Sequence, residues 1–426
     1  MNQDVAAASV LRGVALTPGD KSISHRAFML SALANGESTV EGSSNGEDVL
    51  ATMRIMQQLG ATIASENNVH HVVGPSEGLR AALDELNCGN SGTTLRLLCG
   101  LVASAPGPHH LTGDRSLCAR PTDRVATPLA MMGLPIEGQG PKVFPPLTIV
   151  RGTESLRAIV YESPIPSAQV KSAVLFAGLV ADGVTVIYEK VRTRTNTEEM
   201  LQQTGINVVV TNETGGTKVQ VSPGRPNPHS WSVPGDPSQA AFFVVLGAIH
   251  SDAIVTIPNL YGGLERTGFV RVLERMGAHI ESSTSGSTIS LRSVSSELLG
   301  TVVESSEIPS VDEVPVLAIA AAAASGETRF RNVGELRVKE SDRLTATAVL
   351  VERIGASARI EGDDLIVTGL GSASKFLPFH FHASLDHRMV MSAAIAAAAG
   401  NGAELRGVET VATSFPAFFD VLSSLR

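Results

Sequence analysis

Six copies of one pattern run along the chain, and this repetition constrains the fold more than any other feature. In each copy a run of small apolar residues ends at a turn residue and a β-branched run follows, as in AVLFAGLVADGVTVIYE at 173–189. The turn residues lie 69 to 76 positions apart: Gly36, Gly107, Gly183, Asp252, Gly326 and Gly402. We expect positive φ at these turns, because glycine past a helix end usually adopts it and Asp is a tolerated substitute.

A second element alternates with the first: an amphipathic helix that ends in Gly followed by a small or apolar residue. MRIMQQLGATI and VRVLERMGAHI show its helical spacing plainly. The glycines are Gly60, Gly133, Gly205, Gly277 and Gly355, and the sixth copy stops at Arg426, where its glycine would fall. Each unit is predicted to read helix, strand, helix, strand, strand over about 70 residues. The first helix of each unit is nearly all apolar, so we expect it to be buried on all sides.

The number of copies decides the predicted architecture. A chain of 426 residues suits two domains, and six copies divide naturally into three per domain with a boundary near Gly235. A single α/β barrel would need eight units, so the count of six argues against it. We therefore predict a two-domain α/β (α+β) fold.

Composition excludes several classes of protein. The formal net charge of −9 makes the chain a poor binder of nucleic acid or anionic membranes. Cys88, Cys99 and Cys118 form no CxxC pair, so neither disulfides nor zinc is predicted, and a reducing cytoplasm fits best. We recognise no secretory signal and no membrane-spanning run. The histidines near the end, at 380, 382 and 387, lack an acidic ligand cluster, so we predict no metal site.

Polar residues gather in the turns before the first helices. They read PGDKSISHR (18–26), CGNSGTTLR (88–96), PIPSAQVKS (164–172), VPGDPSQAA (233–241), IPSVDEVP (308–315) and SLDHRMV (384–390). Ser or Asp in five of these turns can cap a helix. For the turn at Gly235, with SQA at 238–240, capping alone is the favoured interpretation.

Capping does not explain the basic residues, because positive charge at a helix N-terminus opposes the helix dipole. Near the first helices these residues are Lys21, Arg26, Arg96, Lys171 and Arg388, and before the second helices they are Arg120, Arg194, Lys339 and Arg343. Cations beside helix N-termini are typical of sites that hold an anion. We predict a cleft between the domains for multiply charged ligands.

Four carboxylates share these turns: Asp48, Asp312, Glu340 and Asp386. Asp312 and Glu340 are the candidates for proton transfer, since an acid among bases stays ionised and can accept or relay a proton. The alternative is that a carboxylate only orients a neighbouring Lys or Arg, and we favour this for Asp386.

The polar turns before the first helices, together with LTGD…ARP and RVKESDRL, resemble the motifs of the EPSP synthase family and occur in the same order. The resemblance extends from about Pro18 to Pro416. Each motif is modest alone, but the ordered combination is highly specific. The resemblance implies two domains of three βαβαββ units each: 20–235, and 236–426 completed by an N-terminal strand within 1–19. It implies transfer of the enolpyruvyl group of phosphoenolpyruvate (PEP) to the 5-hydroxyl of shikimate-3-phosphate, without a metal or organic cofactor.

The resemblance also assigns residues to roles. The positions that match the family's contacts to shikimate-3-phosphate are Lys21, Ser22, Arg26, Ser167, Ala168, Gln169, Arg194, Asp312 and Lys339. The positions that match the family's contacts to PEP are Lys21, Asn90, Gly92, Arg120, Gln169, Arg343 and Arg388. Lys21, Asp312 and Glu340 are implied to be catalytic, with Asp312 as base for the 5-hydroxyl and Glu340 handling the proton at the methylene carbon of PEP.

Two other functions stay open. UDP-N-acetylglucosamine enolpyruvyl transferase has a Lys-Asn pair near its start and a reactive loop cysteine. Here the start reads GDKSISHR, and Cys118 lies two residues before Arg120, which is a different spacing. A non-catalytic anion-binding protein would not need both Asp312 and Glu340. We expect a cytoplasmic monomer acting on these small molecules, with neither nucleic acid nor membrane as partner.

The resemblance bears on glyphosate, an inhibitor that occupies the PEP position in the family. Leu97, Ala168 and Thr413 depart from the sensitive plant and enteric pattern and resemble the second bacterial class, which includes tolerant members. Gly92, where a methyl group would crowd the inhibitor, is kept. We expect intermediate sensitivity.

Overall fold

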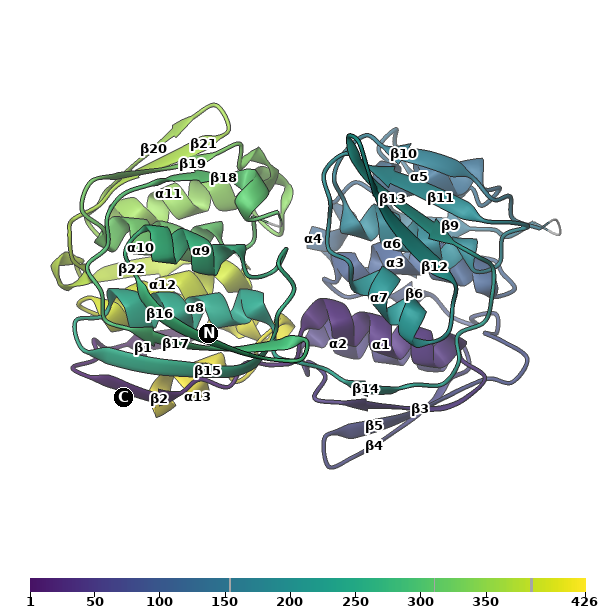
Figure 1. Cartoon of the computed structure of the whole chain (residues 1–426), viewed down its shortest axis with the longest axis horizontal. Coiled ribbons are helices and arrows are strands. Elements are labelled where there is room, and N and C mark those ends of the chain that lie inside the picture. Colours follow the sequence, from purple (N-terminus) through teal and green to yellow (C-terminus); the bar gives the residue numbers. More distant parts are fainter. Residues whose placement is uncertain (153–154, 310, 384–385) are drawn as a thin grey trace. The chain divides into compact units, whose positions relative to one another are not determined.

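The computed structural model describes residues 1–152, 155–309, 311–383 and 386–426 (Figure 1). They form two compact units. The continuous unit is Lys21–Val233, and the split unit combines Met1–Asp20 with Pro234–Arg426. Each unit contains three copies of a βαβαββ arrangement, the sixth with one strand fewer, which confirms the predicted fold class. In five copies a four-stranded sheet combines a parallel pair of strands with an antiparallel pair. A tight turn joins the last two, antiparallel strands of each copy, whereas a helix joins the two parallel strands directly in the second, third and fifth copies.

The continuous unit holds the first three copies. The first contains α1 (Lys21–Leu33), β3 (Gly36–Glu41), α2 (Glu47–Gln58), β4 (Thr62–Glu66) and β5 (Val69–Gly74). The second contains β6 (Leu86–Asn87), α3 (Gly92–Leu101), η1 (Val102–Ser104), β7 (His109–Thr112), α4 (Arg115–Cys118), α5 (Asp123–Met131), β8 (Ile136–Gln139) and β9 (Phe144–Ile149). The third contains β10 (Val160–Ser163), α6 (Ala168–Gly178), β11 (Thr185–Glu189), α7 (Asn196–Gln203), β12 (Val208–Glu213) and β13 (Gly216–Val221).

The split unit holds the other three copies. The fourth contains α8 (Pro237–Ile249), β15 (Ala253–Tyr261), α9 (Gly268–Arg275), β16 (His279–Ser285) and β17 (Thr288–Val294). The fifth contains β18 (Val302–Glu304), η2 (Ser305–Glu307), α10 (Val314–Ala323), β19 (Glu327–Arg331), η3 (Gly334–Val338), α11 (Arg343–Arg353), β20 (Ser357–Glu361) and β21 (Asp364–Thr368). The sixth contains η4 (Ala373–Lys375), β22 (Phe379–His382), α12 (His387–Ala399), β23 (Ala403–Arg406), η5 (Val408–Thr413) and α13 (Phe418–Ser424).

Three strands complete copies that are distant in sequence. β14 (Ser230–Ser232) runs parallel to β3 and supplies the first strand of the first copy. β2 (Leu11–Val14) does the same for the fourth copy beside β15, and β1 (Asn2–Val5) pairs antiparallel with β23 in the three-stranded sheet of the sixth. The first, fourth and sixth copies are therefore each completed by a strand from a distant part of the chain.

The first helices form the interior, as their apolar sequences predict. In the split unit α8, α10 and α12 contact one another pairwise, and every residue of these three helices is buried. Figure 1 shows them inside the unit with its strands around them. Their alanines leave room for close backbone packing, so the helix N-termini and the turns that precede them are held rigidly.

The expectation of positive φ at the six turn residues is only partly correct. Gly36, Gly326 and Gly402 adopt it, but Gly107, Gly183 and Asp252, although described, do not. After α3 the chain continues into a 3-10 turn, and after α8 it leaves the helix directly in an extended conformation. All five glycines that end the second helices do have positive φ.

A close approach of α3 and α6 gives a first prediction. A Cβ on Gly100 would lie 1.9 Å from the carbonyl oxygen of Ala173. Gly100→Ala should lower the free energy of unfolding by about 2 kcal/mol or more, because the backbone of α6 would have to move. Denaturant unfolding followed by circular dichroism measures this. Gly152→Ala is the control, since nothing lies within 4 Å of a Cβ there, and equal stability of the two variants would contradict the prediction.

Candidate active site

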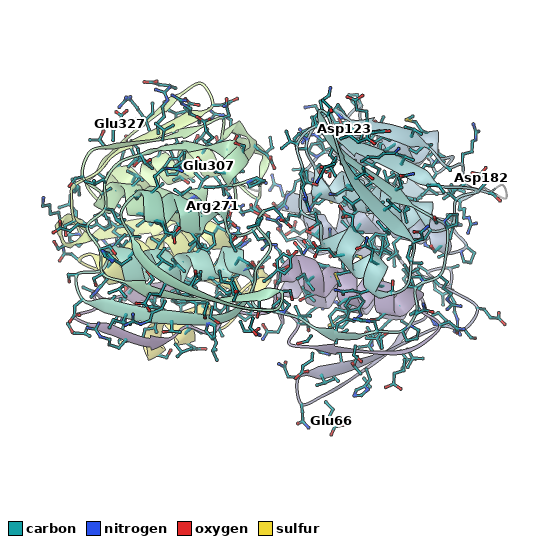
Figure 2. All side chains as sticks on the ribbon, in the orientation of Figure 1. Glu66, Asp123, Asp182, Arg271, Glu307 and Glu327 are labelled. Carbon is teal, nitrogen blue, oxygen red and sulfur yellow. The ribbon has the colours of Figure 1, made fainter. Side chains whose placement is uncertain are left out.

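Charged side chains occupy two kinds of environment in this protein. Glu66 at the end of β4 and Glu327 at the start of β19 are exposed and project into solvent (Figure 2). In contrast, the candidate site residues in the turns before the helices are buried or half-buried, and we group most of them into one named cluster in each unit. The α1 cluster, in the continuous unit, comprises Lys21, Ser22, Arg26, Gln169 and Arg194. The α11 cluster, in the split unit, comprises Asp312, Lys339, Glu340, Arg343 and Arg388.

Lys21 begins α1, and its ammonium nitrogen lies 2.9 Å from Oδ2 of Asp48 in the first turn of α2. The Asp48 side chain is 7% exposed, whereas that of Lys21 is 20% exposed. Asp48 therefore orients Lys21 and leaves part of the lysine side chain open to solvent.

Arg26 lies one turn further along α1 and joins three helices. Its Nε donates to Oγ1 of Thr197 on α7, and its Nη2 donates to Oγ of Ser172 on α6, both at 2.6 Å. Its Nη1 donates to the carbonyl of Ser22 at 2.8 Å, and Nη1 of Arg194 donates to Oγ of Ser22 at 3.3 Å. Two arginines thus meet the first turn of α1.

The SAQ turn combines capping with a second function. Ser167 caps α6 by accepting from the amide of Val170 at 3.4 Å. Gln169 instead reaches α3, where its Oε1 accepts from Nη1 of Arg96 and its Nε2 donates to Oγ1 of Thr93, both at 3.1 Å. Capping alone therefore explains Ser167 but not Gln169.

The GNSG turn places two guanidinium groups beside a glycine. Oδ1 of Asn90 accepts from Nη2 of Arg120 at 2.8 Å, and Nδ2 of Asn90 donates to Asp114 at 2.6 Å. At Gly92, the first residue of α3, a Cβ would lie 2.7 Å from Nη1 of Arg96 and 3.4 Å from Nη1 of Arg120. The missing side chain lets both arginines approach the helix N-terminus.

Sequence reasoning assigned no role to His25, although it lies within the GDKSISHR motif. Its Nδ1 is 2.8 Å from Oγ1 of Thr52, which is 2.8 Å from Oγ1 of Thr94, and Thr94 donates to Oγ of Ser91 at 2.7 Å. This buried chain joins α1 to the cap of α3. Burial lowers the pKa of His25 well below its ordinary value, and the nearby charges of Lys21 and Arg26 lower it further.

Lys171 corrects one prediction, since it was grouped with the cations that hold an anion. Its ammonium lies 2.7 Å from Glu189 and 2.6 Å from Glu198, and all three side chains are 2% exposed. Two buried carboxylates already occupy it, so Lys171 does not face a ligand. Lys171 lies near a helix N-terminus like the other basic residues, but the local sequence does not reveal that its side chain points into the interior.

Arg343 is the centre of the α11 cluster and is 1% exposed. It pairs through Nε with Asp386 at 2.8 Å, through Nη2 with Glu340 at 2.5 Å and through Nη1 with Asp312 at 3.2 Å. Burial by itself would lower the pKa of Arg343, but these three carboxylates raise it above its ordinary value. Asp386 also caps α12 by accepting from the amide of Arg388 at 3.0 Å, which confirms its interpretation as an orienting group.

Asp312 meets the other two cations of the cluster at longer range. Its carboxylate lies 3.8 Å from Nζ of Lys339 and 4.0 Å from Nη2 of Arg388. The preceding residue, Val311, has a φ of 50°, which is rare for a β-branched side chain. Such backbone conformations persist only where the surroundings fix them, and they concentrate at functional sites. The neighbouring Ser310, and Ser384 and Leu385 of the SLDHRMV motif, lie outside the described residues.

Another buried arginine, Arg266, was not predicted. It pairs with Asp20 at 2.9 Å and Asp236 at 2.7 Å, and it donates to Oγ of Ser238 at 3.1 Å. Ser238 in turn donates to Glu313. Arg266 thus links the residue before Lys21 with the residue after Asp312. Nothing in the local sequence GGLERTG marks it, because its partners come from distant turns.

Other kinds of site find little support. No helix within the described ranges is long and apolar enough to cross a membrane, and these ranges contain no His, Cys, Asp and Glu group suited to a metal ion. His380 instead lies 3.0 Å from Glu404. Burial raises the pKa of Cys99 to about 12, so this thiol is not reactive.

The fold, with three βαβαββ copies in each unit and arginines gathered at helix N-termini, defines an enolpyruvyl transferase scaffold. An enolpyruvyl transferase from Streptomyces tendae shares it with a TM-score of 0.79, covering 99% of this chain and 96% of that one. At 17% identity, this likeness concerns the fold alone.

The particular family follows from closer matches. The family model of EPSP synthase (3-phosphoshikimate 1-carboxyvinyltransferase) matches residues 5–422. The 3-phosphoshikimate 1-carboxyvinyltransferase of Acaryochloris marina is 43% identical, with 97% of this chain and 94% of that protein covered. An EPSP synthase structure from Acinetobacter baumannii is 35% identical with a TM-score of 0.86, covering 100% of this chain and 98% of that one. The chain belongs to the EPSP synthase family, as its motifs predict.

Burial of His25 predicts a pH dependence of stability. Its folded-state pKa lies below the unfolded value of 6.5, so the unfolded chain binds the proton more strongly. The contribution of neutral His25 to the stability of the folded state is therefore complete above pH 6.5, and it is lost as the pH falls through the folded-state pKa. Between these two pH values, each unit by which the pH falls should lower the free energy of unfolding by up to about 1.4 kcal/mol through His25.

Urea unfolding at several pH values measures this slope. His25→Asn should reduce it, whatever its effect on absolute stability. The exposed His279→Asn serves as the control, and an identical slope in both variants would contradict the prediction.

Proposed function

We propose that this chain transfers the enolpyruvyl group of PEP to the 5-hydroxyl of shikimate-3-phosphate, releasing phosphate and forming 5-enolpyruvylshikimate-3-phosphate. The observation that carries this proposal is the family match over residues 5–422. Within that span the predicted residues gather into the α1 and α11 clusters, each held by buried arginines.

The α1 cluster, with the GNSG turn beside it, supplies cations and donors for anions. In our proposal Lys21, Ser22, Arg26 and Arg194, with the SAQ turn, bind the phosphorylated sugar. Arg120, Asn90 and Gly92 of the neighbouring turn bind PEP. Two features support this assignment: paired arginines at helix N-termini suit phosphate and carboxylate groups, and Gln169 links the two turns through Arg96.

The α11 cluster supplies carboxylates for proton transfer. We assign Asp312, in its carboxylate form, to accept the proton of the 5-hydroxyl, with Lys339 beside it at 3.8 Å. Glu340, once protonated, delivers its proton to C3 of PEP, and its carboxylate takes up the proton that C3 loses in the elimination. Arg343 and Arg388 bind the PEP anion. The support is geometric, because Asp312 and Glu340 share one guanidinium and therefore have fixed positions relative to each other.

The reaction then proceeds by addition and elimination. Protonation of C3 makes C2 cation-like, the 5-oxygen attacks C2, and a tetrahedral ketal forms. Loss of phosphate from C2 and of a proton from C3 gives the enol ether product. The cations oppose repulsion between the substrate anions, since charges about 4 Å apart interact by about 4 kcal/mol at an effective dielectric constant of 20. No electron transfer occurs, so the proposal includes no redox cofactor. We also propose that the enzyme acts in the cytoplasm as a monomer.

A phosphate-release assay with PEP and shikimate-3-phosphate tests this function. We expect turnover that requires both substrates. Phosphate release with UDP-N-acetylglucosamine in place of the shikimate ester would favour the other enolpyruvyl transferase. Binding of the anions without turnover would indicate a non-catalytic protein.

Removal of either proposed proton-transfer group should reduce rate more than binding. Asp312→Asn and Glu340→Gln should each lower kcat by at least roughly 100-fold, the low end for general acid–base catalysis. Affinity for shikimate-3-phosphate should change far less. The exposed Asp363→Asn and Glu352→Gln are matched controls. Near-normal turnover in either site variant would remove that residue from the mechanism.

Gly92 gives a prediction about inhibitor selectivity. A methyl group at this position would lie 2.7 Å from Nη1 of Arg96 and in ordinary contact, at 3.4 Å, with Nη1 of Arg120, the guanidinium proposed to bind PEP, so it would take up space at the PEP position. Gly92→Ala should raise the inhibition constant of glyphosate, measured against PEP, more than the KM for PEP, because the inhibitor is longer. Gly152→Ala is the control, because a Cβ there has open space and the residue does not have positive φ. An unchanged inhibition constant would show that Gly92 does not face the inhibitor.

A further inference from the structure

The α1 cluster rests on a group of buried charges that the proposed reaction does not use. Lys171 on α6 lies between Glu189, the last residue of β11, and Glu198 in the first turn of α7. Thr193 donates to the other oxygen of Glu189. With 2% of each charged side chain exposed, none of the three touches a substrate, so any functional effect acts through their neighbours.

Burial of these charges is unfavourable in itself. Two carboxylates share one ammonium, and burial raises the pKa of Glu198 even though Lys171 opposes that change. Well-packed apolar residues often stabilise an interior as much as a buried ion pair does. An ion pair differs from apolar packing in its directionality, because it fixes one relative position of the two elements that carry it.

The neighbours of this group are the partners of Arg26. Ser172 follows Lys171 on α6, and Thr197 precedes Glu198 on α7. Their hydroxyl oxygens lie 2.6 Å apart, and each accepts from the Arg26 guanidinium at 2.6 Å. Ser172 also donates to the carbonyl of Ala168 in the SAQ turn at 2.6 Å. The ion pair and the hydroxyl pair therefore join α6 to α7 side by side.

This junction determines where the cations of the α1 cluster lie. Arg194 is two residues before the first residue of α7, so its backbone follows the start of that helix. Arg26 takes its direction from the two hydroxyls. A shift of α7 against α6 would move both guanidinium groups relative to Ser22 and the SAQ turn.

We propose that Lys171 is a positioning residue. Through its ion pair with Glu198 it holds the start of α7 against α6, and it thereby places Arg26 and Arg194 to bind the phosphorylated sugar. This inference rests on the proposed function. It predicts a selective defect, in which affinity for shikimate-3-phosphate falls while PEP binding and the chemical step are retained.

The test is the double variant Lys171→Met/Glu198→Gln, which removes the ion pair at constant net charge and leaves Glu189 with Thr193 as its hydrogen-bond donor. We expect the Kd for shikimate-3-phosphate, measured by isothermal titration calorimetry, to rise roughly tenfold, as for a small displacement of binding groups. At saturating shikimate-3-phosphate, kcat and the KM for PEP should stay within about twofold of the unmodified protein. A general loss of structure would not produce this split.

The matched control is Lys190→Met/Glu162→Gln, which removes an exposed pair at 2.8 Å in the same unit and should change none of these values. If the buried double variant does not fold, Glu198→Gln alone tests the proposal, since Lys171 keeps Glu189 and the same selective defect should appear at smaller size. Unchanged sugar affinity in a folded variant, or a parallel loss for both substrates, would overturn the proposal. The unmodified protein is assayed first, so its failure to bind or turn over shikimate-3-phosphate would instead reject the proposed function.

Discussion

The α11 cluster depends on one buried guanidinium. Arg343 is 1% exposed, and carboxylates from three segments meet it: Glu340 just before α11, Asp312 before α10, and Asp386 at the start of α12. A buried charge costs several kcal/mol unless its partners compensate it, and removing one partner leaves the others uncompensated. These three segments therefore cannot be rearranged independently. The two proposed proton-transfer groups owe their separation to this shared partner, so their geometry follows from stability requirements as much as from the chemistry.

The repeat explains how such clusters arise on an ordinary scaffold. The same turn recurs before six buried helices, and in four of them a Ser or Asp side chain caps the helix: Ser91, Ser167, Asp236 and Asp386. Capping satisfies the helix, and the residues beside each cap are then free to differ between copies. Copies one to three carry lysine, arginine and amide groups there, whereas copy five carries Asp312 and copy six Arg388. Function on this fold is carried by the differences between equivalent turns.

Periodicity predicted most of the fold, but it could not reveal contacts between distant segments. The six copies, their buried helices and the fold class follow from spacing and apolar runs that are local in sequence. The pairing of β14 with β3 and of β2 with β15 has no local signal, because a strand of three or four residues fits many sheets. The same limit applies to side chains. Lys171 has the spacing of a site residue but points inward, while His25 and Arg266 owe their environments to partners brought together only by folding.

Arg266 holds together the two stretches of chain that make up the split unit. In the split unit, the chain at 18–20 runs beside 234–236, where the amide of Asp20 donates to Pro234 at 2.7 Å and that of Asp236 to Pro18 at 2.9 Å. Arg266 pairs with the side chains of both aspartates. Because Lys21 follows Asp20 directly, the backbone that carries the proposed catalytic lysine starts from this clamp. Through Ser238 the same arginine also reaches Glu313, the residue after Asp312. One buried charge thus constrains the backbone next to two of the three proposed catalytic groups, although it need touch neither substrate.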